Sequence, residues 1–287
     1  MIGAGLAVQS SDVAPEHYLK RLGESGEGPH DIALAALMLA ALDHPHTKLN
    51  PYYSHLSEIG EAVRAEVAFV RDGEAAASAL GQVLATRYGY DGDRMEYDEP
   101  GNADLISVME RRRGLPVALG VLYIHAARAA GLKAWGLFAP GHFLLKVAVK
   151  GSEALIDPFN GGAAVDRERF TTPIGAASIL EAGASSEPNP HEAVSDTDVL
   201  LRLQNNIKTR ALQARDTKRA IEVLNRMTLI SPKRAPLWLE LARLHETLGA
   251  LSAARRACEK CLATALAGDP FYNEAALALQ ALKRRLN

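Results

Sequence analysis

The sequence predicts an α+β protein that ends in an all-α region, and three observations support this prediction. Residues 1–100 contain apolar runs and capping residues typical of helices. A buried helix after Pro116 precedes short strand-like runs in hairpin order. Past the linker, the apolar positions all have helical spacing. We therefore predict an N-terminal helical subdomain at 1–100, an α+β core at 101–181, a linker at 182–198 and a helical region at 199–287.

The bulk composition is that of a soluble globular protein. Of the 287 residues, 48% are hydrophobic and 23% are charged, and a chain of this length can bury a sizeable core. No apolar run approaches the roughly 20 residues that span a bilayer. Residues 1–14 contain no Lys or Arg, unlike a signal peptide. We therefore predict a cytoplasmic protein that does not contact a membrane.

Start and stop signals place helices in the N-terminal subdomain. Pro15 suits the first turn of one helix, and Asp31 precedes a run that is apolar all round and therefore buried. Asn50 and Pro51 start another helix. A turn-rich stretch at 89–93 ends the series. The helices predicted after residue 31 are 32–42, 52–70 and 74–88.

The core is predicted from one helix and three strands. Pro116 suits the first turn of a helix that runs to residue 130, and Gly131 suits its C-terminal cap. Gly151 and Ser152 are predicted to form a hairpin turn. A stretch rich in Gly, Ser, Pro, Asn and Asp at 181–198 predicts the linker. The predicted strands are 132–139, 143–149 and 154–157.

The C-terminal region carries a repeat. Ala220 and Ala254 lie 34 residues apart, which is the period of tetratricopeptide repeats. Copies that start at Leu201 and Ala235 bring their small and large apolar positions into register. The region therefore resembles tetratricopeptide repeats, whose stacked helices offer an extended surface to a protein partner.

Two pairs of residues invite a metal or redox interpretation. His44 and His46 flank a Pro in a predicted loop, with no Cys or carboxylate at ligand spacing, which is more typical of a turn than of a metal site. Cys258 and Cys261 fall on inward positions of the second repeat copy, where structural packing is expected. The sequence therefore predicts no metal and no cofactor.

His142 and Asp157 are the candidate catalytic residues. His142 follows a Gly-containing turn at the start of one predicted strand, and Asp157 ends the next, so we expect them side by side. Acyl-transfer enzymes pair a His with a carboxylate and use a nucleophile, often a Cys at a helix N-terminus. A lone His in such a place can also be an ordinary core or surface residue, and that alternative stays open.

The central stretch resembles the transglutaminase-like core of the SirB1 family, in which tetratricopeptide repeats follow such a core. The matching motifs are Arg113-Gly114-Leu115-Pro116, Pro140-Gly141-His142-Phe143 and Ile156-Asp157-Pro158-Phe159-Asn160-Gly161-Gly162. The resemblance implies a papain-like α+β core in which His142 and Asp157 are the family His and Asp. It also implies a nucleophilic Cys at the helix start, where this chain has Pro116 or Val117.

The missing nucleophile decides the functional prediction. Residues 1–257 contain no Cys, and neither Pro nor Val can attack a carbonyl. We expect a non-catalytic, degenerate transglutaminase-like scaffold that binds or regulates, with a protein partner on the repeat region. The alternative is a hydrolase or acyl transferase that uses His142 and Asp157 with a non-cysteine nucleophile or activated water. Arg113 and Asn160, which lie in the matching motifs, are candidate binding residues.

The charge is unevenly distributed along the chain. Residues 1–196 carry 26 acidic and 16 basic side chains, whereas residues 197–287 carry 8 acidic and 16 basic ones. Two interpretations stay open: the two halves attract each other, or the basic half offers a surface to an acidic partner. No basic stripe with interleaved aromatic residues predicts specific nucleic-acid binding.

Overall fold

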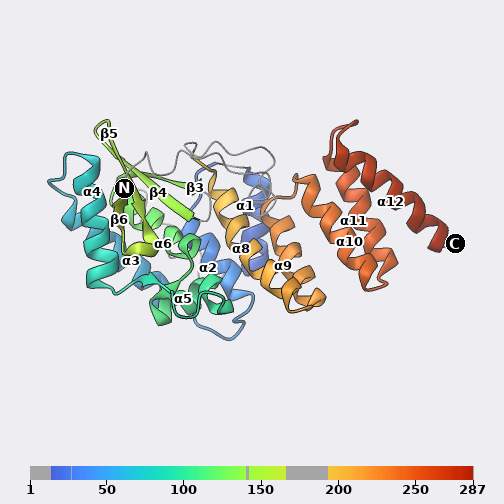
Figure 1. Ribbon diagram of the computed structural model, residues 1–287, viewed down its shortest axis with the longest axis horizontal. Helices are drawn as coiled ribbons and strands as arrows, with labels where there is room; N and C mark the ends of the chain where they lie inside the picture. The colour runs from blue at the N-terminus through green and yellow to red at the C-terminus, as the bar shows by residue number, and fades with distance from the viewer. Residues whose placement is uncertain (1–13, 27, 140–141, 166–192, 287) are drawn as a thin grey trace. The chain divides into compact units, whose positions relative to one another are not determined.

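The computed structural model describes residues 14–26, 28–139, 142–165 and 193–286 (Figure 1). Backbone contacts divide the chain into two compact units. The first unit comprises Met1–Tyr18 and Glu27–Leu203, and the second comprises Leu19–Gly26 and Gln204–Asn287. The four segments predicted from the sequence group the chain differently, and their boundaries stay a prediction.

Helices dominate both units, and a small sheet lies in the first. The α-helices are α1 (Pro15–Ser25), α2 (Ile32–Ala41), α3 (Asn50–Glu66), α4 (Gly73–Gly81), α5 (Leu105–Arg111), α6 (Pro116–Ala129), α8 (Asp196–Gln213), α9 (Thr217–Ile230), α10 (Ala235–Thr247), α11 (Leu251–Thr264) and α12 (Pro270–Leu286). The shorter helices are the π-helix η1 (Gln82–Arg87) and the 3₁₀ helices η2 (Pro100–Ala103) and η3 (Pro158–Asn160). The strands are β1 (Asp91–Gly92), β2 (Arg113–Gly114), β3 (Lys133–Ala139), β4 (His142–Val149), β5 (Ser152–Asp157) and β6 (Ala163–Val165). This mixture confirms the predicted α+β class.

Helix α6 is the centre of the first unit. It packs against α2 and α3 and against strands β3 and β4 (Figure 1). Gly120 lets the sheet approach closely, because a Cβ at this position would lie 2.1 Å from Cε1 of Phe143. Phe143 immediately follows His142, so this contact fixes the start of β4 against the central helix.

The main sheet has the strand order β3-β4-β5-β6, with antiparallel neighbours (Figure 1). The predicted hairpin turn at Gly151 and Ser152 is wrong by one residue, because Ser152 already pairs with Val149. Lys150 and Gly151 form the turn, with φ angles of 48° and 89°. Positive φ at both residues is a feature of the type I′ turn, one of the two favoured connections in two-residue hairpins.

Other predicted boundaries also differ from the structure. Helix α3 ends at Glu66 rather than at residue 70, and the predicted helix 74–88 divides into α4 and the π-helix η1. Strands β1, β2 and β6 were not predicted, since segments of two or three residues carry no readable alternation. Residues 182–192 of the predicted linker lie outside the described residues, as do residues 166–181 of the predicted core and residues 1–13.

Helix α8 begins at Asp196, inside the predicted linker, and Asp196 pairs with other residues of the first unit. The Asp196 carboxylate is almost completely buried and accepts two hydrogen bonds from the Arg128 guanidinium, at 2.7 and 2.9 Å. It also accepts a hydrogen bond from the backbone N–H of His30 at 2.8 Å. This buried pairing explains why an apparent linker residue starts a helix. Asp196 contributed to the polar composition that predicted a loop, but in the structure it makes a long-range contact with Arg128.

The second unit contains the repeat helices and the end of α1. The predicted inward residues Ala220 and Leu224 on α9, and Ala254 on α11, are completely buried. Helix α10 starts at Ala235, as the repeat register predicts. Gly23 of α1 contacts α9 closely, because a Cβ there would lie 2.0 Å from the backbone oxygen of Leu229. The end of α1 therefore packs on the repeat helices.

The two thiols should be inert in the folded protein. Cys258 and Cys261 on α11 are completely buried, and burial raises the pKa of Cys258 and raises that of Cys261 to about 11. Because the thiolate is the reactive form, both thiols should resist an aromatic disulfide reagent at pH 8 and react at once in denaturant. Ser252→Cys, which places a thiol at an exposed position of the same helix, is the matched control and should react without denaturant. Native labelling of the wild type at the control rate would contradict the structural role.

Candidate functional site

His142 and Asp157 lie close together, as the sequence predicts. His142 starts β4 and Asp157 ends the neighbouring strand β5. The Nδ1 atom of His142 lies 4.0 Å from Oδ2 of Asp157. The His142 side chain is 45% exposed, whereas that of Asp157 is only 7% exposed. This distance exceeds that of a hydrogen bond, so the pair is adjacent without the tight His–carboxylate contact of an assembled triad.

The Asp157 carboxylate is occupied by the chain that follows it. It accepts hydrogen bonds from the backbone N–H groups of Phe159 and Asn160, at 2.9 and 3.3 Å. It also accepts one from the Asn160 side-chain amide at 2.5 Å. Asp157 is therefore the N-cap of η3, a role that Asp favours because its oxygen reaches the unpaired N–H groups of a helix start.

The start of α6 carries no nucleophile. The helix begins at Pro116, and its N-cap residue, Leu115, makes no side-chain capping bond. Val117 is 3% exposed and Ala118 is completely buried. The family resemblance places a nucleophilic Cys at this helix start. The structure has only hydrocarbon side chains there.

The two hydroxyls nearest in sequence do not replace it. Tyr123 is completely buried in α6, and burial raises its pKa far above the ordinary value, with further contributions from Asp91 and Asp157. Its hydroxyl has no hydrogen-bond partner among the described residues. It lies so close to Gly162 that a Cβ added to this glycine would be 2.7 Å from the hydroxyl oxygen. Ser107 lies in the first turn of α5, where its backbone N–H is capped by Asp104. Neither hydroxyl is an activated nucleophile in this structure.

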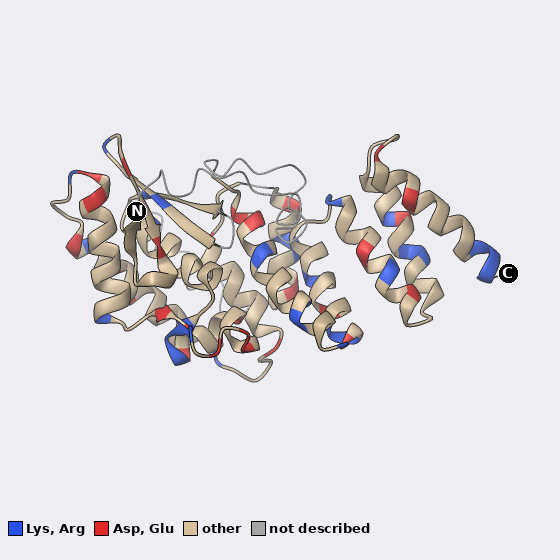
Figure 2. Ribbon diagram, viewed as in Figure 1, with Lys and Arg blue, Asp and Glu red and all other residues tan. Residues whose placement is uncertain are grey.

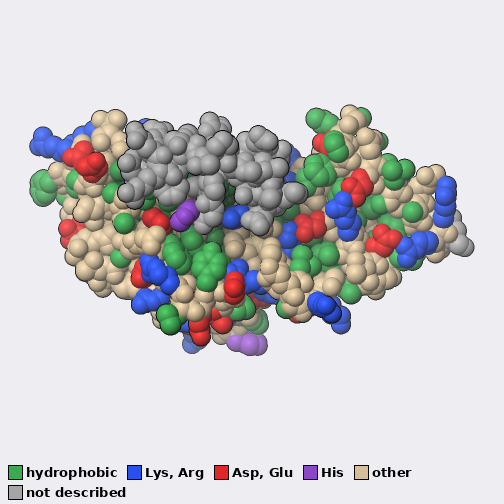
Figure 3. All heavy atoms as spheres, viewed as in Figure 1, with side chains coloured by type: hydrophobic (Ala, Val, Ile, Leu, Met, Phe, Trp, Pro, Cys, Tyr) green, Lys and Arg blue, Asp and Glu red, His purple; other side chains and the backbone are tan. Residues whose placement is uncertain are grey.

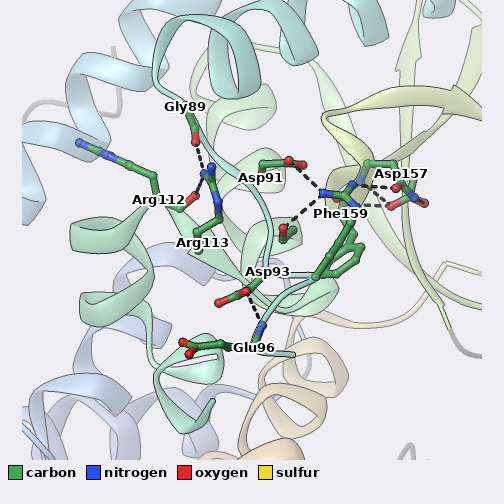
Figure 4. Close-up of polar contacts among 11 residues, drawn as sticks. Gly89, Asp91, Asp93, Glu96, Arg112, Arg113, Asp157 and Phe159 are labelled. Carbon is green, nitrogen blue, oxygen red and sulfur yellow. Dashed lines mark hydrogen bonds and ion pairs between the residues drawn. The ribbon is translucent and has the colours of Figure 1, made fainter. Parts of the chain in front are cut away.

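Arg94 links Asp91 to Phe159 and Asn160, the two residues that donate to Asp157, and the sequence did not reveal this role. Its guanidinium donates to the Asp91 carboxylate at 2.9 Å, to the Phe159 carbonyl at 2.8 Å and to the Asn160 side-chain oxygen at 2.9 Å. It also lies over the Phe159 ring, 5.1 Å from the centroid. Figure 4 shows Asp91, Phe159 and Asp157, the labelled residues around these contacts. The one available signal was the spacing of Asp91 and Arg94, three residues apart in a turn-rich stretch.

The two candidate binding residues have defined positions. Asn160 bridges the site, because its amide donates to Asp157 and its oxygen accepts from Arg94. Arg113 is exposed in β2 and donates to the backbone oxygens of Gly89 and Arg112, both at 2.9 Å (Figure 4). Of the two, only Asn160 contacts Asp157 among the contacts of the described residues. A ligand-binding role for either residue stays a prediction.

The structure changes the interpretation of His44. Its Nε2 atom lies 3.1 Å from the carboxylate of Asp104, the residue that caps α5, so it is not simply a solvated turn residue. Within the described ranges, no group of three or more His, Cys, Asp or Glu side chains is placed to hold a metal ion.

An open pocket of about 340 Å³ lies beside the last motif. It is lined by residues of α4 and η1 and by residues 161–164, and neither His142 nor Asp157 lines it. The pocket therefore does not mark the His–Asp pair as a substrate site.

Comparison with protein families covers both parts of the chain. Residues 50–205 match the family described as transglutaminase-like superfamily. Residues 207–287 match the family described as tetratricopeptide repeat. The first match includes the His142–Asp157 pair, the start of α6 and the Asp91–Arg94 turn.

Several curated proteins are similar to this chain. A UPF0162 protein of Xylella fastidiosa (strain 9a5c) is 29% identical over 226 residues, which cover 77% of this chain and 79% of that protein. The UPF0162 protein of Pseudomonas aeruginosa is also 29% identical, over 82% of this chain and 84% of its own length. The human F-box only protein 21 is 32% identical over 82 residues, which cover 29% of this chain and 13% of that protein.

Proposed function

The chain belongs to the transglutaminase-like superfamily, and from this premise we propose that its core is a non-catalytic scaffold and that its repeat region contacts a protein partner. The observation that supports the first part is the apolar start of α6, where Pro116, Val117 and Ala118 offer no attacking group. In enzymes of this kind, loss of the nucleophile removes most of the chemical rate.

The state of Asp157 supports the same proposal. A carboxylate that orients a catalytic His needs to accept a hydrogen bond from it. Here the carboxylate accepts three hydrogen bonds from Phe159 and Asn160, and His142 stays 4.0 Å away. Asp157 thus has a sufficient structural reason to be present without catalysis.

The repeat match supports the second part of the proposal. Tetratricopeptide repeats stack helix pairs into an extended surface that commonly binds other proteins. The region also carries the excess of basic side chains, which favours an acidic partner segment over a basic one.

One observation favours a second candidate function. His142 is 45% exposed beside a buried carboxylate, which is an arrangement that can activate water. This alternative is a hydrolase or acyl transferase that uses His142 and Asp157. It predicts that His142→Ala removes an activity while the melting temperature stays near that of the wild type.

The test is turnover by the full-length protein. Amidase, peptidase and transamidase activities should be absent from the wild type and from His142→Ala alike. Turnover that His142→Ala abolishes, with an unchanged melting temperature, would establish the hydrolase alternative and overturn the scaffold proposal.

A further inference from the structure

The loop between β1 and η2 exposes apolar side chains beside the candidate site. We call residues 93–99 the Met95 loop. The Met95 side chain is 93% exposed and that of Tyr97 is 44% exposed. The Tyr97 ring packs edge-on against Phe159, with the ring centroids 5.8 Å apart, so the loop and η3 present one continuous surface. Scattered exposed hydrophobic residues are ordinary. These two differ because they lie on a loop whose backbone is held in place.

Hydrogen bonds from buried side chains hold the loop in one conformation. Asn102 is completely buried, and its amide donates to the backbone oxygens of Glu96 and Tyr97, at 2.6 and 3.4 Å. Its side-chain oxygen accepts from Arg111 at 2.9 Å. The Asp93 carboxylate accepts from the backbone N–H of Glu96 at 2.9 Å (Figure 4). A surface fixed in this way loses little conformational entropy when a partner binds.

The charge of the loop indicates what kind of partner fits. Residues 93–99 contain four carboxylates and one Arg. Arg94 pairs with Asp91, and Asp93 lies 3.6 Å from Arg111. Glu96, Asp98 and Glu99 are exposed around Met95 and Tyr97. Figure 2 marks the acidic and basic residues along the ribbon, and Figure 3 shows acidic, basic and hydrophobic side chains mixed on the face that it displays. An apolar centre with an acidic rim fits a basic peptide.

We propose that the Met95 loop and Phe159 form a docking surface for a basic, partly apolar peptide segment of a partner protein. Met95 and Tyr97 contact an aliphatic or aromatic side chain of the peptide, and the unbranched thioether of Met adapts to its shape. Glu96 and Glu99 attract its Lys or Arg side chains. This surface is a second one, separate from the repeat region, and it gives the scaffold core a binding role of its own.

Selection of phage-displayed random peptides on the full-length protein tests this proposal. Peptides rich in Lys or Arg with one large apolar residue should be enriched. Met95→Ser combined with Tyr97→Ser should weaken their binding at least tenfold, and so should Glu96→Lys combined with Glu99→Lys. Phe69→Ser is the matched control, because Phe69 is also 93% exposed but lies outside the loop, and it should leave binding unchanged.

Three results would overturn the proposal. The first is enrichment of acidic peptides or of none, and the second is binding by the loop variants as strong as that of the Phe69→Ser control. Self-association of the wild type that the Met95→Ser and Tyr97→Ser pair abolishes would assign the surface to a second copy of the chain. Each of these outcomes is independent of turnover, so failure here is distinguishable from failure of the scaffold proposal.

Discussion

Replacing Asp157 with Ala should lower the free energy of unfolding of the first unit by about 2 kcal/mol, because three N–H donors lose their acceptor and η3 loses its cap. His142→Ala should cost less than about 0.5 kcal/mol, since the side chain is 45% exposed. The two members of the pair should therefore differ strongly in their contribution to stability.

Two tryptophans make this measurement specific. Trp135 lies on β3 in the first unit and Trp238 on α10 in the second. In a Trp238→Phe background, the fluorescence of Trp135 reports urea unfolding of the first unit alone, which matters because two-unit chains need not unfold in one step. Equal losses for Asp157→Ala and His142→Ala would mean that the His is as structural as the Asp, contrary to this account.

Arg128→Ala should cost more, about 3 kcal/mol, because it leaves the Asp196 carboxylate buried without its charged partner. Arg128 also donates to the backbone oxygen of Ala134 through two nitrogens, at 3.0 and 2.9 Å. The loss should appear in the Trp135 transition. In a double-mutant cycle, Arg128→Ala and Asp196→Ala should show a coupling energy of about 2 kcal/mol.

Arg113→Ala is the matched control for Arg128. Its guanidinium is exposed, and among the described residues it donates only to the backbone oxygens of Gly89 and Arg112. We expect a loss below about 0.5 kcal/mol. If both Arg variants lost stability equally, the anchor at the start of α8 would not depend on its buried ion pair.

The elements that carry a strong periodic pattern were predictable from the sequence. The apolar run after Pro116 gave the central helix, and the order of three short strands placed His142 beside Asp157. The repeat period gave the start of α10 at Ala235. In each case the signal lies within a segment of about ten or more residues, or in a fixed spacing along the chain.

The contacts that define the site were not predictable in the same way. Arg94 reaches Phe159 and Asn160 across more than sixty positions of sequence, and Arg128 reaches Asp196 across a similar separation. Such pairings depend on the folded sheet, and no local pattern encodes them. Asp157 was predicted as a catalytic residue from its place at a strand end, but its capping role depends on the conformation of η3.

The central claim is that the core lacks a nucleophile at the start of α6. The most direct measurement is transfer of the glutamine side-chain acyl group of a peptide to a primary amine, with release of ammonia, by the full-length protein. An active transglutaminase is the assay standard. We expect the wild-type rate to equal that of His142→Ala and that of the reaction without protein. Wild-type turnover that depends on His142 would contradict it.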